Sequence, residues 1–404
     1  MNALQETFHR TLTFTPRDEK QIARVDFTPG AGIEKIAVEY QVSGESVVDL
    51  GLEINGQVKG WSGGARRQFI ISENFATEGY TRTAIVDGTW SVLLGLYKIR
   101  ADCEVTVTVT LFKKHYRWLK GDTHLHSVHS DGKLTIAELI NRAQAQGLDF
   151  LCFTDHNTTS QNREIAGFNS PLCLIPGMEL TSERGHVNFT GTAQPVASFL
   201  PHFTAADIAA RMNEARQNGA RIGINHPFCR HCPWQNPLSD YDWLEIWNGP
   251  WDASTNNEQA FAWWYQQLCA GKRISVVAGS DFHKEKGLIC AYTWTRAQST
   301  GREDILNALA RGRSYLKSDG PTDLHQFCIG EAGPGETASG SLLHVSLSTH
   351  PDNRVLLYTD RHVITLPHNG HVDQHIDIND AAFALLRVNH GPVAQLITNP
   401  VYRG

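Results

Sequence analysis

The sequence lacks several features that mark specialised classes of protein. No stretch approaches the roughly 18 apolar residues that a membrane-spanning helix needs. The first ten residues have no apolar segment of the kind found in a secretory signal peptide, so we expect a cytoplasmic protein. There is no run rich in Lys and Arg, and the net charge is −6. We therefore expect neither nucleic acid nor a membrane as a partner, and a small molecule instead.

The sequence also lacks a disulfide framework, internal repeats and low-complexity segments. Its eight cysteines are scattered, and several stand inside apolar stretches. Such positions favour reduced, buried thiols in a cytoplasmic enzyme. The pair Cys229-Arg-His-Cys232 has the spacing of half a zinc site, but no second half follows at a suitable distance. We interpret it as a loop at the mouth of the site that is described below.

What is present indicates a multidomain α/β protein. A chain of 404 residues is long enough for two or three domains, and a hydrophobic content of 41% supports real cores. Residues 1–115 show short alternating stretches and turn signals such as Asn55-Gly56, which predict a β-sandwich or jelly-roll-like domain. We interpret this domain as a packing or dimerisation element, and a binding module is the alternative.

Residues 116–320 change to strands that alternate with helices. Thr135 and Glu138 predict a capping box, and the helix from Ile136 is expected to stop at Gly147. This alternation indicates a (β/α) barrel, in which the loops at the carboxyl ends of the strands face one mouth. Residues 321–404 return to short strands and predict a small C-terminal β domain.

The most informative stretch runs from Gly121 to Gly132. His124 and His126 stand two residues apart at the end of an expected strand, so both imidazoles leave the same face. Further acidic and histidine residues follow later strands next to Gly or Pro. The complete set of candidate ligands is His124, His126, Asp131, His156, Glu179, His186, His226, Asp281 and His283.

These nine side chains exceed what one ion requires, since a catalytic zinc takes three protein ligands. We therefore expect two or three divalent ions, and mixed histidine and carboxylate ligands suit Zn, Mn or Fe. A carboxylate such as Glu179 can bridge two ions. Paired ions activate a water and stabilise a displacement, so the expected reaction is hydrolysis, with phosphate esters as the first substrate class.

The motifs resemble those of the PHP (polymerase and histidinol phosphatase) family between about residues 118 and 290. The resemblance rests on the following stretches: His124-x-His126 with Ser130-Asp-Gly132, Thr154-Asp-His156, Gly177-x-Glu179, Asn225-His-Pro227 and Gly279-Ser-Asp-x-His283. Other stretches resemble the CehA/McbA-type branch: Pro176-Gly-Met-Glu179, Gly185-His-Val-Asn188, Glu245-Ile-Trp-Asn-Gly-Pro-Trp251 and residues 312–321. The resemblance implies a distorted seven-stranded (β/α) barrel with flanking β domains and phosphoesterase activity.

The resemblance also implies how the ligands are shared. His124, His126, Glu179 and Asp281 would hold one ion, and these four are our candidate catalytic residues. Glu179 would bridge to a second ion bound by His226 and His186. Asp131, His156 and His283 would hold a third ion, or the second site of a dinuclear member. The position of Asp131 is often histidine in trinuclear relatives, so the sequence leaves two or three ions open.

Cations and aromatic residues beside these motifs are the candidates for contacting the substrate. Arg184, Arg230 and Lys284, together with Lys286, are candidates for binding a phosphate. Trp247 and Trp251 flank an expected strand-end loop and are candidates for stacking on the substrate. Trp263 and Trp264 lie on an expected helix and are interpreted as core.

Three functions remain open from the sequence. The first is a metal-dependent phosphoesterase with a metal-activated water. The second is hydrolysis of a carbamate or carboxylic ester at the same ions. The third is a non-catalytic β binding module that carries a degenerate barrel, against which the intact ligand set argues. An oligomer is compatible with each of them.

Overall fold

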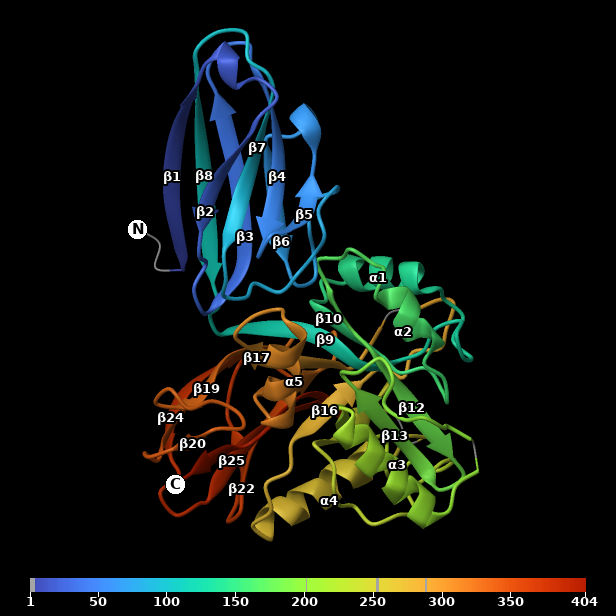
Figure 1. Cartoon of the computed structure of the whole chain (residues 1–404). Helices are drawn as coiled ribbons and strands as arrows, with labels where there is room; N and C mark the ends of the chain where they lie inside the picture. Colours follow the sequence, from blue (N-terminus) through green and yellow to red (C-terminus); the bar gives the residue numbers. More distant parts are fainter. Residues whose placement is uncertain (1–3, 201, 252–253, 288) are drawn as a thin grey trace. The chain divides into compact units, whose positions relative to one another are not determined.

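The computed structural model describes residues 4–200, 202–251, 254–287 and 289–404. The chain divides into two compact units (Figure 1). Unit 1 comprises residues 1–116, 169–171 and 298–301, and unit 2 comprises the remainder. Among the described residues, no helix combines the length and apolar character needed to cross a membrane.

Unit 1 consists of two four-stranded antiparallel sheets around a shared core. Its strands are β1 (Gln5–Phe14), β2 (Ile22–Phe27), β3 (Ile33–Val42), β4 (Val47–Ile54), β5 (Gln57–Trp61), β6 (Gln68–Ser72), β7 (Trp90–Lys98) and β8 (Cys103–Lys113). The sheet orders are β1-β8-β3-β6 and β2-β7-β4-β5. Valines of β8 and leucines of β4 meet in one cluster of buried side chains. The expected turn at Asn55-Gly56 connects β4 to β5, and both residues have positive φ.

Unit 2 contains three further sheets. Its strands up to residue 320 are β9 (Arg117–Leu125), β10 (Phe150–Phe153), β11 (Cys173–Ile175), β12 (Gly177–Ser182), β13 (Gly185–Thr190), β14 (Arg221–Ile224), β15 (Trp243–Asn248), β16 (Val276–Gly279), β17 (Tyr292–Ala297) and β18 (Ser314–Lys317). The later strands are β19 (Asp323–Ile329), β20 (Thr337–Ala338), β21 (Leu342–Ser348), β22 (Arg354–Thr359), β23 (Val363–Leu366), β24 (His371–Asp377), β25 (Phe383–His390), β26 (Val393–Thr398) and β27 (Val401–Arg403).

Two of these sheets position the site. The larger one runs β11-β10-β9-β17-β18-β26-β25-β22-β23, with β20 and β27 attached, and the second runs β12-β13-β14-β15-β16. Parallel bridges connect the two sheets, one from Leu125 to Phe282 and one from His156 to Glu179. The hydroxyl of Thr123 on β9 also donates to the carbonyl of Ala278 on β16, at 3.0 Å. The ends of β9, β10, β12 and β16 therefore come together.

Helices cover these strands. They are α1 (Ile136–Ala145), α2 (Ser160–Ile165), α3 (Ala205–Gln217), α4 (Asn257–Cys269) and α5 (Arg302–Ala310). The expected capping box of Thr135 and Glu138 is present at α1, and Thr204 with Asp207 forms another at α3. In each box the threonine side chain accepts a backbone N–H and the carboxylate accepts one in return, which satisfies donors at the helix start.

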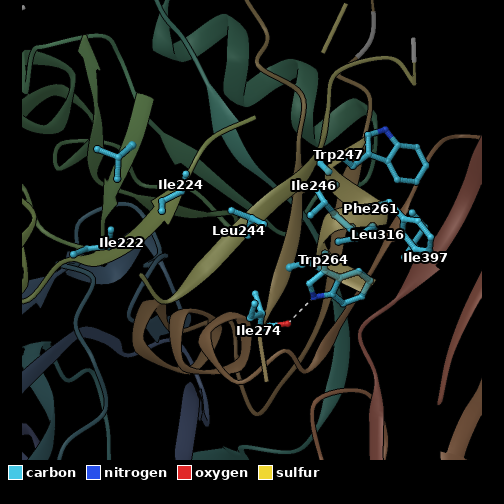
Figure 2. Close-up of a cluster of buried hydrophobic side chains, with 14 of the residues drawn as sticks. Ile222, Ile224, Leu244, Ile246, Trp247, Phe261, Trp264, Ile274, Leu316 and Ile397 are labelled. Atoms are coloured by element: carbon cyan, nitrogen blue, oxygen red, sulfur yellow. Dashed lines mark hydrogen bonds between the residues drawn. The ribbon is translucent and has the colours of Figure 1, made fainter. Parts of the chain in front are cut away.

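A large apolar core lies between α3, α4 and the sheet β12-β13-β14-β15-β16. Figure 2 shows part of it, including Ile224 of β14 and Leu244 of β15. Trp264 of α4 is fully buried there, and its indole N–H donates to the carbonyl of Ile274 at 3.0 Å. Burial of these side chains holds the second sheet in place, since each fully buried large apolar side chain contributes about 1.5–3 kcal/mol.

One expectation about residues 116–320 is wrong. The strands do not form one parallel sheet with a helix between each pair, because β12 and β13 are an antiparallel hairpin and β17 pairs antiparallel with β9. The hairpin turns at Glu183 and Arg184, and β13 then begins at Gly185, whose φ of +104° suits glycine. The strands after residue 320 also extend the sheet of β9, through the pairing of β18 with β26.

Candidate metal centre

The site begins at the end of β9. Residues 121–125 are all buried, and His124 and His126 are both 0% exposed. Their ring centroids are 5.1 Å apart, as expected for two side chains on the same face of a strand. Asp131 follows in the turn before α1 and is exposed. The sequence prediction that these imidazoles share one space agrees with this geometry.

Glu179 lies at the centre of the site and is completely buried. It stands inside β12 rather than at its end. Its Oε1 atom is 3.4 Å from Nε2 of His124, 3.1 Å from Nδ1 of His186 and 3.7 Å from Nε2 of His226. Its Oε2 atom is 2.7 Å from Nδ1 of His156 and 3.6 Å from Nε2 of His126. One carboxylate therefore faces five imidazoles that come from four different segments of the chain.

Asp281 contributes a second carboxylate just after β16. Its Oδ1 atom is 3.0 Å from Nε2 of His126 and 3.4 Å from Nε2 of His124. A third carboxylate comes from Asp131, whose Oδ1 atom is 3.2 Å from Nε2 of His283 and 3.7 Å from Nε2 of His156. Oxygen and nitrogen atoms in these ranges are spaced like ligands around common ions.

All nine candidate ligands come together in this way. The structure groups their donor atoms into overlapping sets whose members lie within 4.8 Å of one another. The sets are His126, Asp131, His156 and His283; His124, His126 and Asp281; His156, Glu179 and His186; His124, His226 and Glu245; and His186, His226 and Cys232. Each set shares a member with another, so the donors form one continuous centre.

The hydrogen bonding of the buried imidazoles indicates that these residues suit metal ions. Nε2 of His124 and both ring nitrogens of His126 are buried and have no hydrogen-bond partner among the described residues. Buried polar atoms are nearly always satisfied, and an exception indicates a missing water or ion. In both rings Nε2 points at carboxylate oxygens, so divalent ions would satisfy the imidazoles and the carboxylates together.

The electrostatics of the site keep its carboxylates charged. Burial raises the pKa of Glu179, but His124, His186 and His156 outweigh it and hold that pKa well below its usual value. Burial acts in the same direction on Asp281, where His124 and His126 likewise hold the pKa low. Burial lowers the pKa of His126 to about 4. Ionised carboxylates and a neutral imidazole are the protonation states that bind cations.

Sequence reasoning missed residues that hold the ligands. Glu245 on β15 accepts from Nδ1 of His124 at 3.0 Å and from the backbone N–H of His226 at 3.0 Å. Asn225 donates to Oε1 of Glu179 at 2.6 Å. Such outer contacts orient metal-binding imidazoles and carboxylates. An acidic residue inside the apolar stretch Trp243–Trp247 is the signal that could have identified Glu245.

The backbone at the centre is also unusual. His226 and Asp281 have positive φ values of 27° and 50°, which side chains other than glycine rarely adopt. Gly279 is required because a Cβ there would overlap Oε1 of Glu245 and Cβ of His124. Strained backbone and close approach are concentrated at functional sites.

The proposed substrate contacts are placed less favourably. Trp247 is 1% exposed, belongs to the large core, and donates its indole N–H to the carbonyl of Gly249. The structure therefore corrects its assignment as a substrate contact. Arg184 donates to Oδ1 of Asn236 at 3.0 Å and to the carbonyl of Gln235, so it holds a loop. Arg230 and Lys284 are exposed.

Comparison with known families gives one match to a family model. Residues 122–225 match the model of the PHP domain. This stretch contains His124, His126, Asp131, His156, Glu179 and His186 of the centre.

Relatives are found over part of the chain. The 5′-3′ exoribonuclease Rnm of Salmonella typhimurium is 31% identical over 125 residues, which cover 29% of this chain and 41% of the relative. The 5′-3′ exoribonuclease of Haemophilus influenzae is 42% identical over 65 residues, covering 16% of this chain and 24% of the relative. The chain thus spans less than half the length of these curated relatives.

Solved structures with partial likeness come from two other bacteria. A two-domain protein from Bacteroides vulgatus, described as containing a PHP-like metal-dependent phosphoesterase, has 19% identity and a TM-score of 0.42, covering 71% of this chain and 96% of that one. A protein from Bifidobacterium adolescentis, described as a metal-dependent phosphoesterase, has 16% identity and a TM-score of 0.31, covering 42% of this chain and 90% of that one.

Proposed function

Because residues 122–225 carry a PHP domain, we propose that this chain is a phosphoesterase that depends on two or three divalent ions of Zn, Mn or Fe. The observation that carries the proposal is the convergence of five imidazoles on the buried carboxylate of Glu179. The unsatisfied ring nitrogens of His124 and His126 support it further. Mixed nitrogen and oxygen donors suit these ions.

Each group of ligands has a proposed role. Glu179 would be a ligand common to two ion positions, because its two oxygens face different histidines. His124, His126 and Asp281 complete one position, and His186 and His226 complete the second. The third position is made by Asp131, His156 and His283. When bound, the ions would supply an activated water and neutralise the charge of a phosphoryl group.

The proposed substrate is a phosphate ester. Arg230 and Lys284 are exposed cations near ligand motifs, and we propose that they bind its phosphate. The 5′ end of an RNA is the second candidate, favoured by the names of the exoribonuclease relatives. A carbamate or carboxylic ester is the alternative for the same ions, because an activated water can also attack a carbonyl carbon.

Metal content tests the centre first. Protein purified without chelator or histidine tag is analysed for bound metal per chain, beside Glu179→Gln and the control Asp373→Asn. Asp373 is a fair control because it is an exposed carboxylate that also accepts from a histidine, His344, at 2.8 Å. We expect two or three equivalents in the wild type and the control, and at least one fewer in Glu179→Gln. Wild-type protein that takes up no Zn, Mn or Fe would overturn the proposal.

A substrate panel then tests the reaction. The metal-loaded protein is assayed on an aryl phosphate, on a 5′-phosphorylated oligoribonucleotide and on an aryl carbamate. Hydrolysis of either phosphate ester that stops on chelation supports a phosphoesterase, and the faster of the two identifies the class. Hydrolysis of the carbamate alone would move the carbonyl-ester alternative to the front. Metal binding without any hydrolysis would favour the non-catalytic binding module.

The finer architecture and location belong to the same proposal. We propose that the strands around the centre close as a distorted seven-stranded barrel, supported by the bridges Leu125–Phe282 and His156–Glu179. Residues 1–115 and 321–404 would be its flanking β domains, and the barrel would belong to the CehA/McbA-type branch that its motifs resemble. A cytoplasmic location is supported by the eight cysteines, which are not joined in disulfides.

A further inference from the structure

The motif Cys229-x-x-Cys232 has the spacing of a metal site but contributes none of the nine candidate ligands. In the structure it stands directly beside a ligand. We propose that Cys232 is a positioning residue for His226: its sulfur accepts the N–H at Nδ1 of His226 and so holds Nε2 towards Glu179 and the second ion position. The inference rests on the proposed metal centre and adds a thiol to it.

The contact itself has the geometry of a weak hydrogen bond to sulfur. Sγ of Cys232 lies 3.7 Å from Nδ1 of His226. The opposite nitrogen, Nε2, faces Oε1 of Glu179 at 3.7 Å. His226 is 4% exposed, so neither nitrogen is freely available to water. A buried imidazole with one nitrogen at an ion needs an acceptor for the other.

The same division of roles recurs in other histidines of the centre. His124 directs Nδ1 at Glu245, 3.0 Å away, and Nε2 at Glu179 and Asp281. His283 directs Nδ1 at the carbonyl of Asp281, 2.7 Å away, and Nε2 at Asp131. In these two rings Nδ1 meets a fixed acceptor and Nε2 faces carboxylates of the proposed metal centre, whereas in His156 and His186 it is Nδ1 that faces Glu179. Cys232 takes for His226 the place that a carboxylate takes for His124.

The loop that carries Cys232 is itself well held. The backbone N–H of Cys229 donates to the carbonyl of His226 at 2.9 Å, which starts a tight turn after the ligand. The backbone N–H of Trp234 donates to the carbonyl of Pro227 at 2.9 Å, which closes the loop. Trp234 also packs so closely on Gly185 that a Cβ there would meet its Cα at 2.8 Å. The position of the sulfur is therefore set by the fold.

The neighbouring thiol makes this contact sensitive to oxidation. Sγ of Cys229 lies 3.3 Å from Sγ of Cys232, and both thiols are free. A small-molecule disulfide can oxidise the pair: the two thiols give up two protons and two electrons, the Cys229–Cys232 bond forms, and the reagent is reduced to two thiols. The sulfur of Cys232 is then drawn towards Cys229, and its contact with Nδ1 weakens.

Metal affinity and a Co²⁺ spectrum test the proposal together. Wild type, Cys232→Ala, Cys232→Ser and the control Cys229→Ser are loaded with Co²⁺ under reducing conditions, and affinity is measured by competition with a chromophoric chelator. We expect Cys232→Ala to lose about 10- to 100-fold in affinity at one position. Cys232→Ser should recover part of this loss because its hydroxyl accepts the same N–H, and Cys229→Ser should stay at the wild-type value. Wild-type protein treated with oxidised glutathione should show a similar loss that a dithiol reverses.

Three results would overturn the inference. Unchanged affinity in Cys232→Ala means that the sulfur does not position His226. A sulfur-to-cobalt charge-transfer band that disappears in Cys232→Ala means that Cys232 is a direct ligand instead. Equal losses in Cys232→Ala and Cys232→Ser, with no recovery, mean that the side chain only packs. These results all require that the wild type binds cobalt, whereas failure of the wild type to bind any ion removes the proposed function itself.

Discussion

Strands β8 and β9 follow one another in the chain but bury different kinds of side chain. In β8 alternate residues are buried, and the buried face consists of Cys103, Val105, Val107, Val109 and Leu111. In β9 every residue from Gly121 to Leu125 is buried, and these include Asp122 and His124. The first pattern is that of a strand with one face on a core. The second places polar groups where water cannot solvate them.

The comparison indicates that the residues that stabilise the fold and the residues of the candidate metal centre lie on different strands. The buried face of β8 is stabilised by the removal of apolar surface from water and needs no partner. The polar groups of β9 cost free energy unless each finds a partner. Asp122 accepts from the backbone N–H of Ser280 at 2.9 Å, whereas Nε2 of His124 has no hydrogen bond among the described residues. The partner that we propose for Nε2 of His124 is a divalent ion.

Removal of the ions should therefore affect β9 and leave β8 unchanged. At an ion concentration 1,000-fold above the dissociation constant, binding stabilises the native state by about 4 kcal/mol. We expect chelation to lower the protection of amides in β9 and β12 against hydrogen exchange by up to that amount. Mass spectrometry of peptic peptides measures it, with the peptides of β8 as the internal control. Equal loss of protection in β8 and β9 would contradict the separation, and adding the ion back should restore β9.

A cavity in the core of unit 1 should give the reverse result. Leu50 of β4 is fully buried among the side chains of that core. Leu50→Ala removes that packing and is expected to cost about 3 kcal/mol of unfolding free energy. Denaturant titration of the full chain measures this loss, when unfolding is followed by hydrogen exchange in peptides from unit 1. Metal content should remain at the wild-type value. Loss of bound metal together with the loss of stability would mean that the two regions are not separable.

Features that depend on residues close together in the chain could be predicted from the sequence. The turn at Asn55-Gly56, the capping box of Thr135 and Glu138 and the shared face of His124 and His126 all follow from residues close together in the chain. Because the carboxyl ends of strands gather, the convergence of distant histidines could also be inferred. The PHP resemblance was confirmed over residues 122–225.

What could not be predicted depends on contacts between distant segments. Glu245 reaches His124 across 121 positions of the chain, and no local pattern announces such a pair. The antiparallel pairing of β12 with β13, through a turn at Glu183 and Arg184, departs from the parallel sheet that the alternation of strands and helices indicated. Trp247 was expected at a loop, but packing against α4 buries it. The periodicity of apolar residues describes one helix or strand at a time. These three features depend on which other helix or strand packs against it.

A change that leaves every ligand in place should weaken the centre by an intermediate amount. Glu245→Gln keeps the size of the side chain but removes the charge that faces Nδ1 of His124 at 3.0 Å. Outer contacts of this kind typically change metal affinity about 10- to 100-fold. Competition with a chromophoric chelator measures the change, with Glu258→Gln as the matched control in the same unit, because Glu258 pairs with Arg387 away from the centre. If Glu245→Gln binds metal like the control, the contact to His124 does not tune the site.

The smallest expected effect separates general stability of unit 2 from the centre that it contains. Thr204 caps α3, where its side chain accepts the N–H of Asp207 at 3.2 Å and its own N–H is accepted by the carboxylate of Asp207 at 2.9 Å. Thr204→Ala removes the cap and should cost about 1 kcal/mol, whereas Thr204→Ser keeps a hydroxyl acceptor and should cost less. Chemical denaturation measures both variants. Because α3 supplies none of the nine ligands, metal affinity should be unchanged in either variant. A fall in affinity for Thr204→Ala would show that the centre responds to any loosening of unit 2, and the contrast between β8 and β9 would then reflect stability rather than ligand chemistry.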